Sequence, residues 1–162
     1  MNRSDSVTNL AKALAQAQRE IRGAKKDSEN PFFRSKYADL ASVMEACREP
    51  LAKNGLAVVQ CPSNGPDGGI TLETILAHES GEWISSMLTM MPVIPVKKDS
   101  QGLVVTRDPQ EELMMKNDPQ RLGSTITYAR RYALAAMVGV AAEDDDGAAA
   151  SGTITSGTWG TP

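Results

Sequence analysis

Hydrophobic positions recur with two different periods along this chain, and the change of period separates helical from extended segments. Residues 6–24 carry apolar side chains at three- and four-residue spacing, which predicts an amphipathic helix that stops near Gly23. The same spacing from about residue 37 or 38 predicts a second helix. Pro50 should break or restart that helix, and Asn54-Gly55 should close it.

The middle of the chain shows the two-residue period of β-strands. A short apolar run at 56–61 is followed by turn-forming residues at 63–69. Apolar positions then alternate along 70–77, with Ile70, Leu72, Thr74 and Leu76 on one face. The sequence HESGE leads into a second run at 83–91, so residues 70–91 are predicted to form a hairpin.

Residues 92–118 contain three prolines and mixed charge, and they show no clear period. A long segment of this kind inside a compact domain is usually functional or mobile. We expect one of these two roles for it.

A last helix is predicted over about 119–139, with Gly139 at its end. At about 100° per residue, one stripe is apolar and comprises Leu122, Ile126, Ala129, Ala133 and Met137. The residues roughly opposite are Arg121, Ser124, Tyr128, Arg131 and Tyr132. Arg130 falls at the edge of the apolar stripe, where we expect it to pair with a carboxylate.

The order of these elements predicts an α+β fold. An antiparallel sheet of three or more strands would pack with the N-terminal helices and with the helix at about 119–139. We expect residues 1–147 to form a single core domain and 148–162, rich in Ala, Ser, Gly and Thr, to form a flexible C-terminal tail.

The charge and the cysteine content limit the kinds of protein that this sequence could encode. The net charge of -3 and a pI near 5.2 give no global basic signature of nucleic-acid binding. Residues 1–60, however, carry ten Lys/Arg against seven Asp/Glu, which leaves room for a local basic surface. Cys47 and Cys61 lack metal-type spacing, and the chain has no long apolar run, so we expect a soluble, cytoplasmic protein without a membrane partner.

Few features of the sequence suggest an enzyme active site. The single histidine, His78, lies beside a hairpin turn, and no GxxxxGK[ST] motif is present to bind ATP phosphates. The acidic run at 143–146 could bind Mg²⁺ as nuclease carboxylates do. Consecutive residues project to opposite sides, however, which favours a solvated run or a protein contact. We therefore predict no enzyme activity, metal or cofactor.

Binding of single-stranded nucleic acid fits the pattern better. Cations that meet phosphates and aromatic rings that stack on bases are the two features such binding needs. A buried helix whose tyrosines fill the core explains the pattern in 119–139 about equally well, but the basic and aromatic segment 25–37 shifts the balance towards binding. The candidate binding residues are Lys25, Lys26, Arg34, Lys36, Tyr37, Arg121, Tyr128, Arg131 and Tyr132.

Three blocks of sequence, 30–60, 70–86 and 120–147, resemble the Erf family of phage single-strand annealing proteins. The most specific block reads G-S-x-x-T-Y-A-R-R-Y-x-L from Gly123 to Leu134 and is followed by the acidic run. By this resemblance, the Lys36-Tyr37 pair and the Tyr128–Tyr132 block are signature positions.

The resemblance implies ATP-independent binding of single-stranded DNA and annealing of complementary strands during phage recombination in the host-cell cytoplasm. It also implies a homo-oligomer, such as a ring, and makes a phage exonuclease or a host single-strand binding protein a candidate partner. We further predict that Arg130 pairs with Asp144, Asp145 or Asp146 of its own or a neighbouring subunit.

Two alternatives stay open from the sequence. The first is a metal-dependent DNA enzyme that uses the acidic run. The second is a structural or adaptor protein whose tyrosine–arginine helix forms a subunit interface without affinity for DNA.

Overall fold

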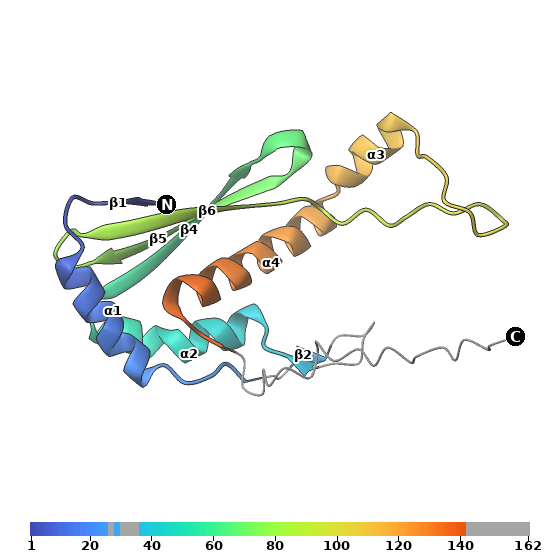
Figure 1. Ribbon diagram of the computed structural model, residues 1–162. Coiled ribbons are helices and arrows are strands. Elements are labelled where there is room, and N and C mark those ends of the chain that lie inside the picture. The colour runs from blue at the N-terminus through green and yellow to red at the C-terminus, as the bar shows by residue number, and fades with distance from the viewer. Residues whose placement is uncertain (26–27, 30–35, 142–162) are drawn as a thin grey trace, which may run out of the picture.

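An antiparallel sheet with helices packed against it forms the body of the protein (Figure 1). The computed structural model describes residues 1–25, 28–29 and 36–141. The elements are β1 (Asn2–Arg3), α1 (Thr8–Glu20), β2 (Ser28–Glu29), β3 (Lys36–Tyr37), α2 (Leu40–Lys53), β4 (Leu56–Asn64), a 3-10 turn (Pro66–Gly68), β5 (Ile70–His78), β6 (Trp83–Met90), α3 (Pro109–Lys116) and α4 (Pro119–Val138). The predicted α+β class is confirmed.

The main sheet has the strand order β1-β6-β5-β4, and every neighbouring pair is antiparallel. The predicted hairpin is β5 and β6, with Ile70 opposite Met90 and Ala77 opposite Trp83. Strand β4 is longer than the predicted run at 56–61 and continues to Asn64. Strands β2 and β3 form a separate two-stranded ribbon.

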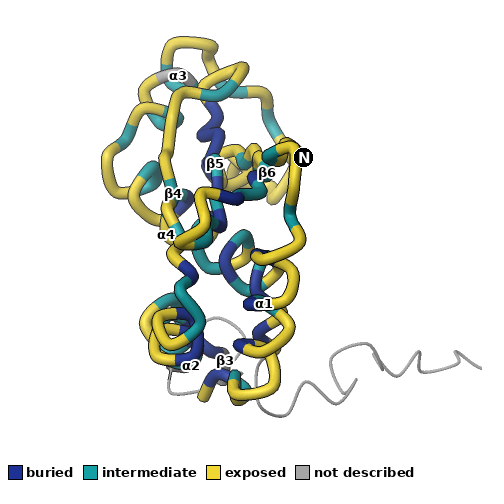
Figure 2. Tube along the Cα trace, turned by 90° about the vertical axis from the view of Figure 1, so that its left-hand side faces the viewer, coloured by how far each residue is buried: buried dark blue, intermediate teal, exposed yellow. Residues whose placement is uncertain are grey.

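One face of the sheet is buried by helices. The alternation predicted along β5 is confirmed, since Leu72, Thr74 and Leu76 are completely buried. Helix α4 runs along this face, and α1 and α2 lie on the same side (Figure 1). Figure 2 shows the buried positions along β5 and on the facing sides of α1 and α2. The main core cluster includes Leu10, Ala17, Val43, Cys47, Leu51, Leu56, Leu76, Leu134 and Val138.

The apolar stripe predicted for α4 is wrong in its position. The buried residues of the helix are Thr125, Ala129, Leu134 and Val138, and Ala129 is the only one of them in the predicted stripe. The helix changes the side that it buries because its contacts change along its length. Thr125 and Ala129 lie outside the core cluster that α1 and α2 form, whereas Leu134 and Val138 belong to it.

The ends of α4 are as expected. Asp118 caps its first turn, where its side chain accepts a hydrogen bond from the Gln120 amide (3.0 Å). Gly139 ends it in the left-handed conformation, with a φ of 77°.

The expectation that Pro50 interrupts the second helix is also wrong. Helix α2 continues through Pro50 to Lys53. Pro50 lies in the last turn, so its missing N–H costs one backbone hydrogen bond close to the point where the helix ends anyway. Asn54 and Gly55 close the helix as predicted. The Asn54 Nδ2 donates to the Pro50 carbonyl (2.8 Å), and Gly55 has a φ of 65°.

The segment without a clear period contains two short structures. One is helix α3, whose eight residues are too few to show a helical period. The other is a hairpin-like turn in which Lys98 pairs with Val104. Asp99 Oδ1 accepts hydrogen bonds from the Gln101 and Leu103 amides and so closes the tip of this turn. We call residues 91–108 the arm, because they project from the end of the molecule that carries α3 (Figure 1).

A carboxylate from the β5–β6 turn caps helix α1. Val7, at the N-cap position, provides no side-chain hydrogen bond. Instead, buried Glu82 accepts hydrogen bonds from the Leu10 amide (2.8 Å), Ser6 Oγ (2.8 Å) and Asn9 Nδ2 (3.1 Å). The Leu10 amide contributes most to holding the pKa of Glu82 below its usual value. This contact fixes α1 to the sheet.

Replacing Glu82 with Gln should therefore change how stability depends on pH. A carboxylate with a lowered folded-state pKa stabilises the fold above its unfolded pKa of about 4.3, and this stabilisation disappears as the pH falls through the folded-state pKa. We expect Glu82→Gln to lower the melting temperature at pH 7 and to flatten the loss of stability as the pH falls below about 5. Glu79→Gln, in the same turn, is the matched control. Parallel pH profiles for wild type and Glu82→Gln would contradict the assignment.

Candidate nucleic-acid interface

An aromatic and cationic cluster occupies the solvent-facing side of α4. The rings of Tyr128 and Tyr132 are stacked, with centroids 6.3 Å apart and planes at 25°. The guanidinium carbon of Arg131 lies 5.3 Å from the Tyr128 centroid and 4.4 Å from the Tyr132 centroid. These are cation–π distances, so the three side chains hold one another in position.

Both tyrosines remain accessible from solvent in this arrangement. Tyr128 is 40% exposed and Tyr132 is 51% exposed. They therefore do not fill the core, which was the alternative explanation of the sequence pattern. Gly123, Ser124 and Thr127 are also exposed on α4.

Arg131 also connects α4 with the end of β3. Its Nη1 donates a hydrogen bond to the Ala38 carbonyl (3.2 Å), directly after Lys36 and Tyr37. Two blocks that are about 90 residues apart in the sequence thus meet beside the tyrosine cluster. For Lys36 and Tyr37 the structure describes the backbone, which pairs with Glu29 and Ser28.

The other candidate residues lie in different places. Lys25 is exposed and follows Ala24, whose amide donates to the Ala141 carbonyl just beyond the end of α4. Lys26, Arg34, Asp144, Asp145 and Asp146 lie outside the described residues.

Arg121 is engaged near the start of α4. Its Nη1 donates to the Val93 carbonyl (2.9 Å), and its Nε lies 3.4 Å from Asp118 Oδ2. The hydrogen bond to Val93 joins the helix to the arm. A DNA contact by Arg121 stays a prediction.

Arg130 points away from the tyrosine cluster, towards β4. Its Nε donates to Gln60 Oε1 (3.3 Å), and Gln60 Nε2 donates back to the Arg130 carbonyl (3.0 Å). Within the described residues, Arg130 forms no ion pair with a carboxylate. Its predicted pairing with the acidic run stays a prediction, because that run lies outside the described part. The sequence pattern had not pointed to Gln60, since a lone glutamine on a strand carries no helical or charge signal.

Neither a metal-binding cluster nor a membrane-spanning helix is found in the described part of the chain. No group of three or more His, Cys, Asp or Glu residues there could hold a metal ion. His78 contacts Ser80 Oγ through Nδ1 (2.9 Å), within the β5–β6 turn. No described helix combines the length and apolar character needed to cross a bilayer.

Comparison with known families assigns the chain. A sequence model of the ERF superfamily matches residues 10–156, which is most of the chain and extends from the first turn of α1 through α4. The protein belongs to the ERF superfamily. Membership connects it with phage recombination by single-strand annealing. Searches among curated proteins and among solved structures found no match.

The contacts of Arg131 predict a structural role besides any role in binding. Arg131→Lys keeps the charge but loses the planar guanidinium that stacks on the rings and reaches Ala38. We expect it to lower the free energy of unfolding by about 1 kcal/mol, measured by urea denaturation. Arg48→Lys is the control, because Arg48 is exposed on α2 and makes one surface ion pair with Glu45. Equal stability of both variants would show that the Arg131 cluster contributes nothing to the fold.

Proposed function

We propose that the protein binds single-stranded DNA without ATP, working as a homo-oligomer, and promotes the annealing of complementary strands. The observation that carries this proposal is the cluster of Tyr128, Arg131 and Tyr132. Two exposed rings flank a guanidinium on this helix. This arrangement offers flat surfaces for bases next to a cation for phosphate, and stacking tolerates any base.

Annealing by this route requires no nucleotide hydrolysis, because base pairing between the two strands supplies the free energy. The protein has to reduce the repulsion between phosphates and to keep bases extended and accessible. A surface that stacks bases and neutralises phosphates does both. The predicted contacts of Lys36 and Tyr37 would extend the same surface, since Arg131 holds Ala38 beside the cluster.

The annealing activity can be measured directly. Two complementary dye-labelled oligonucleotides are mixed with the protein in the absence of ATP, at low and moderate salt. We expect faster duplex formation that weakens as salt increases, because phosphate contacts release counterions. Mg²⁺-dependent degradation of a labelled strand would instead support a DNA enzyme. A folded oligomer that binds neither strand would support the adaptor alternative.

Substitutions in the cluster separate stacking from charge. Stacking of one base on an aromatic ring contributes about 1–3 kcal/mol. Tyr132→Ala should therefore raise the Kd for an oligonucleotide about five- to 150-fold. Tyr132→Phe keeps the ring and should bind nearly as wild type. Arg131→Ala should reduce the slope of log K against log salt by about 0.7, the value for one contact to a single strand. Lys12→Ala, an exposed cation on α1, is the control for charge.

Unchanged binding by both Tyr132→Ala and Arg131→Ala, in variants shown to be folded, would contradict the assignment of the interface to α4. A similar loss in Lys12→Ala would point to a diffuse electrostatic attraction in place of a defined site.

A further inference from the structure

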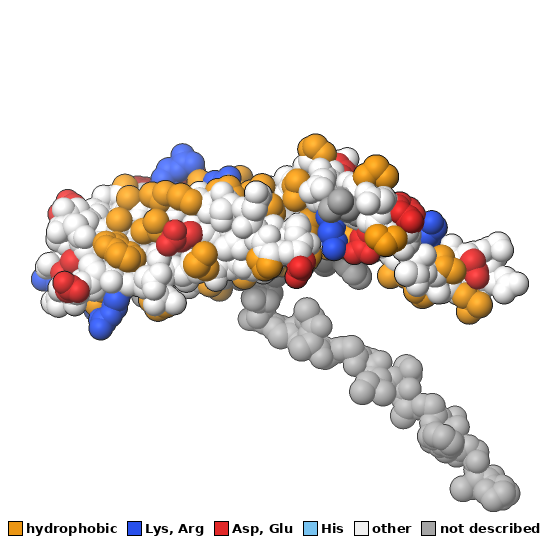
Figure 3. All heavy atoms as spheres, turned by 90° about the horizontal axis from the view of Figure 1, so that it is seen from above, with side chains coloured by type: hydrophobic (Ala, Val, Ile, Leu, Met, Phe, Trp, Pro, Cys, Tyr) orange, Lys and Arg blue, Asp and Glu red, His pale blue; other side chains and the backbone are white. Residues whose placement is uncertain are grey.

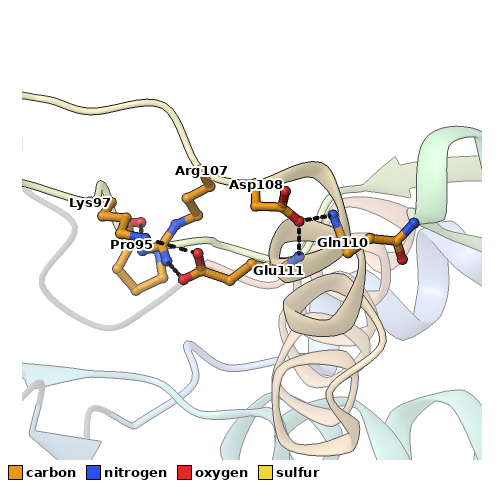
Figure 4. A network of polar contacts seen from close by, with 6 residues as sticks. All are labelled: Pro95, Lys97, Arg107, Asp108, Gln110 and Glu111. Atoms are coloured by element: carbon orange, nitrogen blue, oxygen red, sulfur yellow. Dashed lines mark hydrogen bonds and ion pairs between the residues drawn. The ribbon is translucent and has the colours of Figure 1, made fainter.

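The arm exposes several hydrophobic residues, but its surface is mixed. Val93 is 80% exposed and Val104 is 71% exposed, and charged side chains lie among the hydrophobic ones on this projecting end (Figure 3). Glu111, in α3, accepts hydrogen bonds from Lys97 Nζ (2.9 Å) and Arg107 Nη1 (2.6 Å) (Figure 4). These polar groups hold the shape of the arm, and its surface indicates no particular ligand.

A groove between β6 and α4 is different, because its walls are mainly apolar. It has a volume of about 480 Å³, which lies within the range of about 300–1,000 Å³ that is typical of small-ligand sites. Helix α4 runs alongside the sheet here (Figure 1). Ile84 and Leu88 line the groove from the strand, and Ala136 and Met137 line it from the helix. We call it the β6 groove.

The β6 groove continues the surface that is proposed to bind DNA. Tyr132 belongs to the aromatic cluster and also lines the groove. None of the described residues that line the groove has a charged side chain, so a phosphate placed inside would lose its hydration without gaining a cation. An aromatic ring would instead meet apolar walls and the polarizable sulfur of Met137. The lining therefore suits a base, with the phosphates outside beside Arg131.

The edge of β6 contributes unpaired backbone groups to the same groove. Strand β1 pairs only with Ile84 and Ser85, so β6 has no further neighbour on that side among the described strands. The Ser4 amide donates to the Trp83 carbonyl (2.9 Å), which shows that Trp83 turns its backbone towards β1. This direction alternates along an antiparallel strand. The N–H and C=O of Met87 therefore face the open edge, and Met87 borders the groove.

An open N–H and C=O on one residue match the edge of a nucleobase. Each of the four bases carries a donor next to an acceptor on its Watson–Crick edge, and proteins that bind unpaired strands read this edge by hydrogen bonds. The backbone of Met87 offers one acceptor and one donor. The Ser86 hydroxyl, which also lines the groove, can serve as either. Such a set accepts any base.

We propose that the β6 groove holds a nucleobase of the bound strand. The walls from β6 and α4 contact the ring, and the Met87 backbone hydrogen-bonds its Watson–Crick edge. This inference rests on the proposed function and deepens it, because it assigns a second type of base contact beside the tyrosine cluster. Stacking on Tyr128 and Tyr132 leaves the edge of a base free, whereas the groove occupies that edge.

Occupation of the Watson–Crick edge would let the protein distinguish a single strand from a duplex. A paired base has no free edge to offer, so it cannot make the contact with Met87. Binding in the groove therefore favours unpaired strands, and the duplex that annealing produces loses this contact. The strand would stay bound before annealing and be released afterwards.

A chemical change in the DNA, combined with a change in the protein, tests the contact. The DNA probes are a short oligothymidine and the same strand built from 3-methylthymine, which lacks the N3–H donor but keeps the ring and the phosphates. We expect methylation to raise the Kd of the wild type about two- to tenfold, the effect of one lost hydrogen bond. In Ala136→Leu, which fills the groove, both strands should bind with the same, weaker Kd.

Ala15→Leu is the matched control, because Ala15 is an exposed alanine on α1 away from the groove. It should keep the wild-type response to methylation, and circular dichroism should show both variants folded. A wild-type Kd that ignores methylation would overturn the proposal, and so would an equally large effect of methylation in Ala136→Leu. A change of oligomer size in Ala136→Leu with the wild-type Kd would also overturn it and assign the groove to a contact between subunits.

Free thymidine separates this inference from the proposed function. In protein labelled at its methionines, we expect thymidine to shift the NMR signals of the Met137 methyl group and the Met87 amide. The exposed Met114 on α3 should not respond. These shifts in a protein that binds no oligonucleotide would refute the proposed function and leave the groove as a nucleobase site. Normal binding of oligonucleotides with no effect of methylation or of thymidine would refute the groove alone.

Discussion

The packing of α4 against β5 is the contact on which the rest of the structure depends. Leu72, Thr74 and Leu76 on the strand and Ala129 on the helix are completely buried. Ala129 is small enough to let the helix lie close to the sheet, and a larger side chain there would have to displace a neighbour in a tightly packed core. The sheet packs on one side of α4 and α2 on another, and Tyr128 and Tyr132 stay exposed to solvent.

The alternating pattern of the strands made the sheet predictable from the sequence. The buried side of α4 could not be predicted in the same way. Residues 70–77 bury one side of a strand, so a period of two determines which side chains face the core. Helix α4 packs on the sheet near its start and joins the core of α1 and α2 near its end. No single stripe at 100° per residue describes a helix that buries two sides, and for this reason Leu134 and Val138 were missed.

Local signals identified the candidate site only in part. The spacing of Tyr128, Arg131 and Tyr132 placed them together on the exposed side of α4, which a helix wheel shows correctly. The hydrogen bond of Arg131 to Ala38 and that of Arg130 to Gln60 join residues far apart in the chain, and sequence spacing contains no information about such pairs. The arm was recognised as irregular, but its internal order depends on Glu111, which contacts Lys97 across fourteen residues.

The two adjacent arginines show how one helix can serve two surfaces. Successive residues of a helix project about 100° apart. Arg131 therefore lies against the tyrosine rings and Ala38, whereas Arg130 reaches Gln60 at the edge of the sheet and lines a crevice between α2, β4 and α4. Because both arginines are carried by the same helix, the position of α4 on β4 also sets the direction in which the tyrosine rings point.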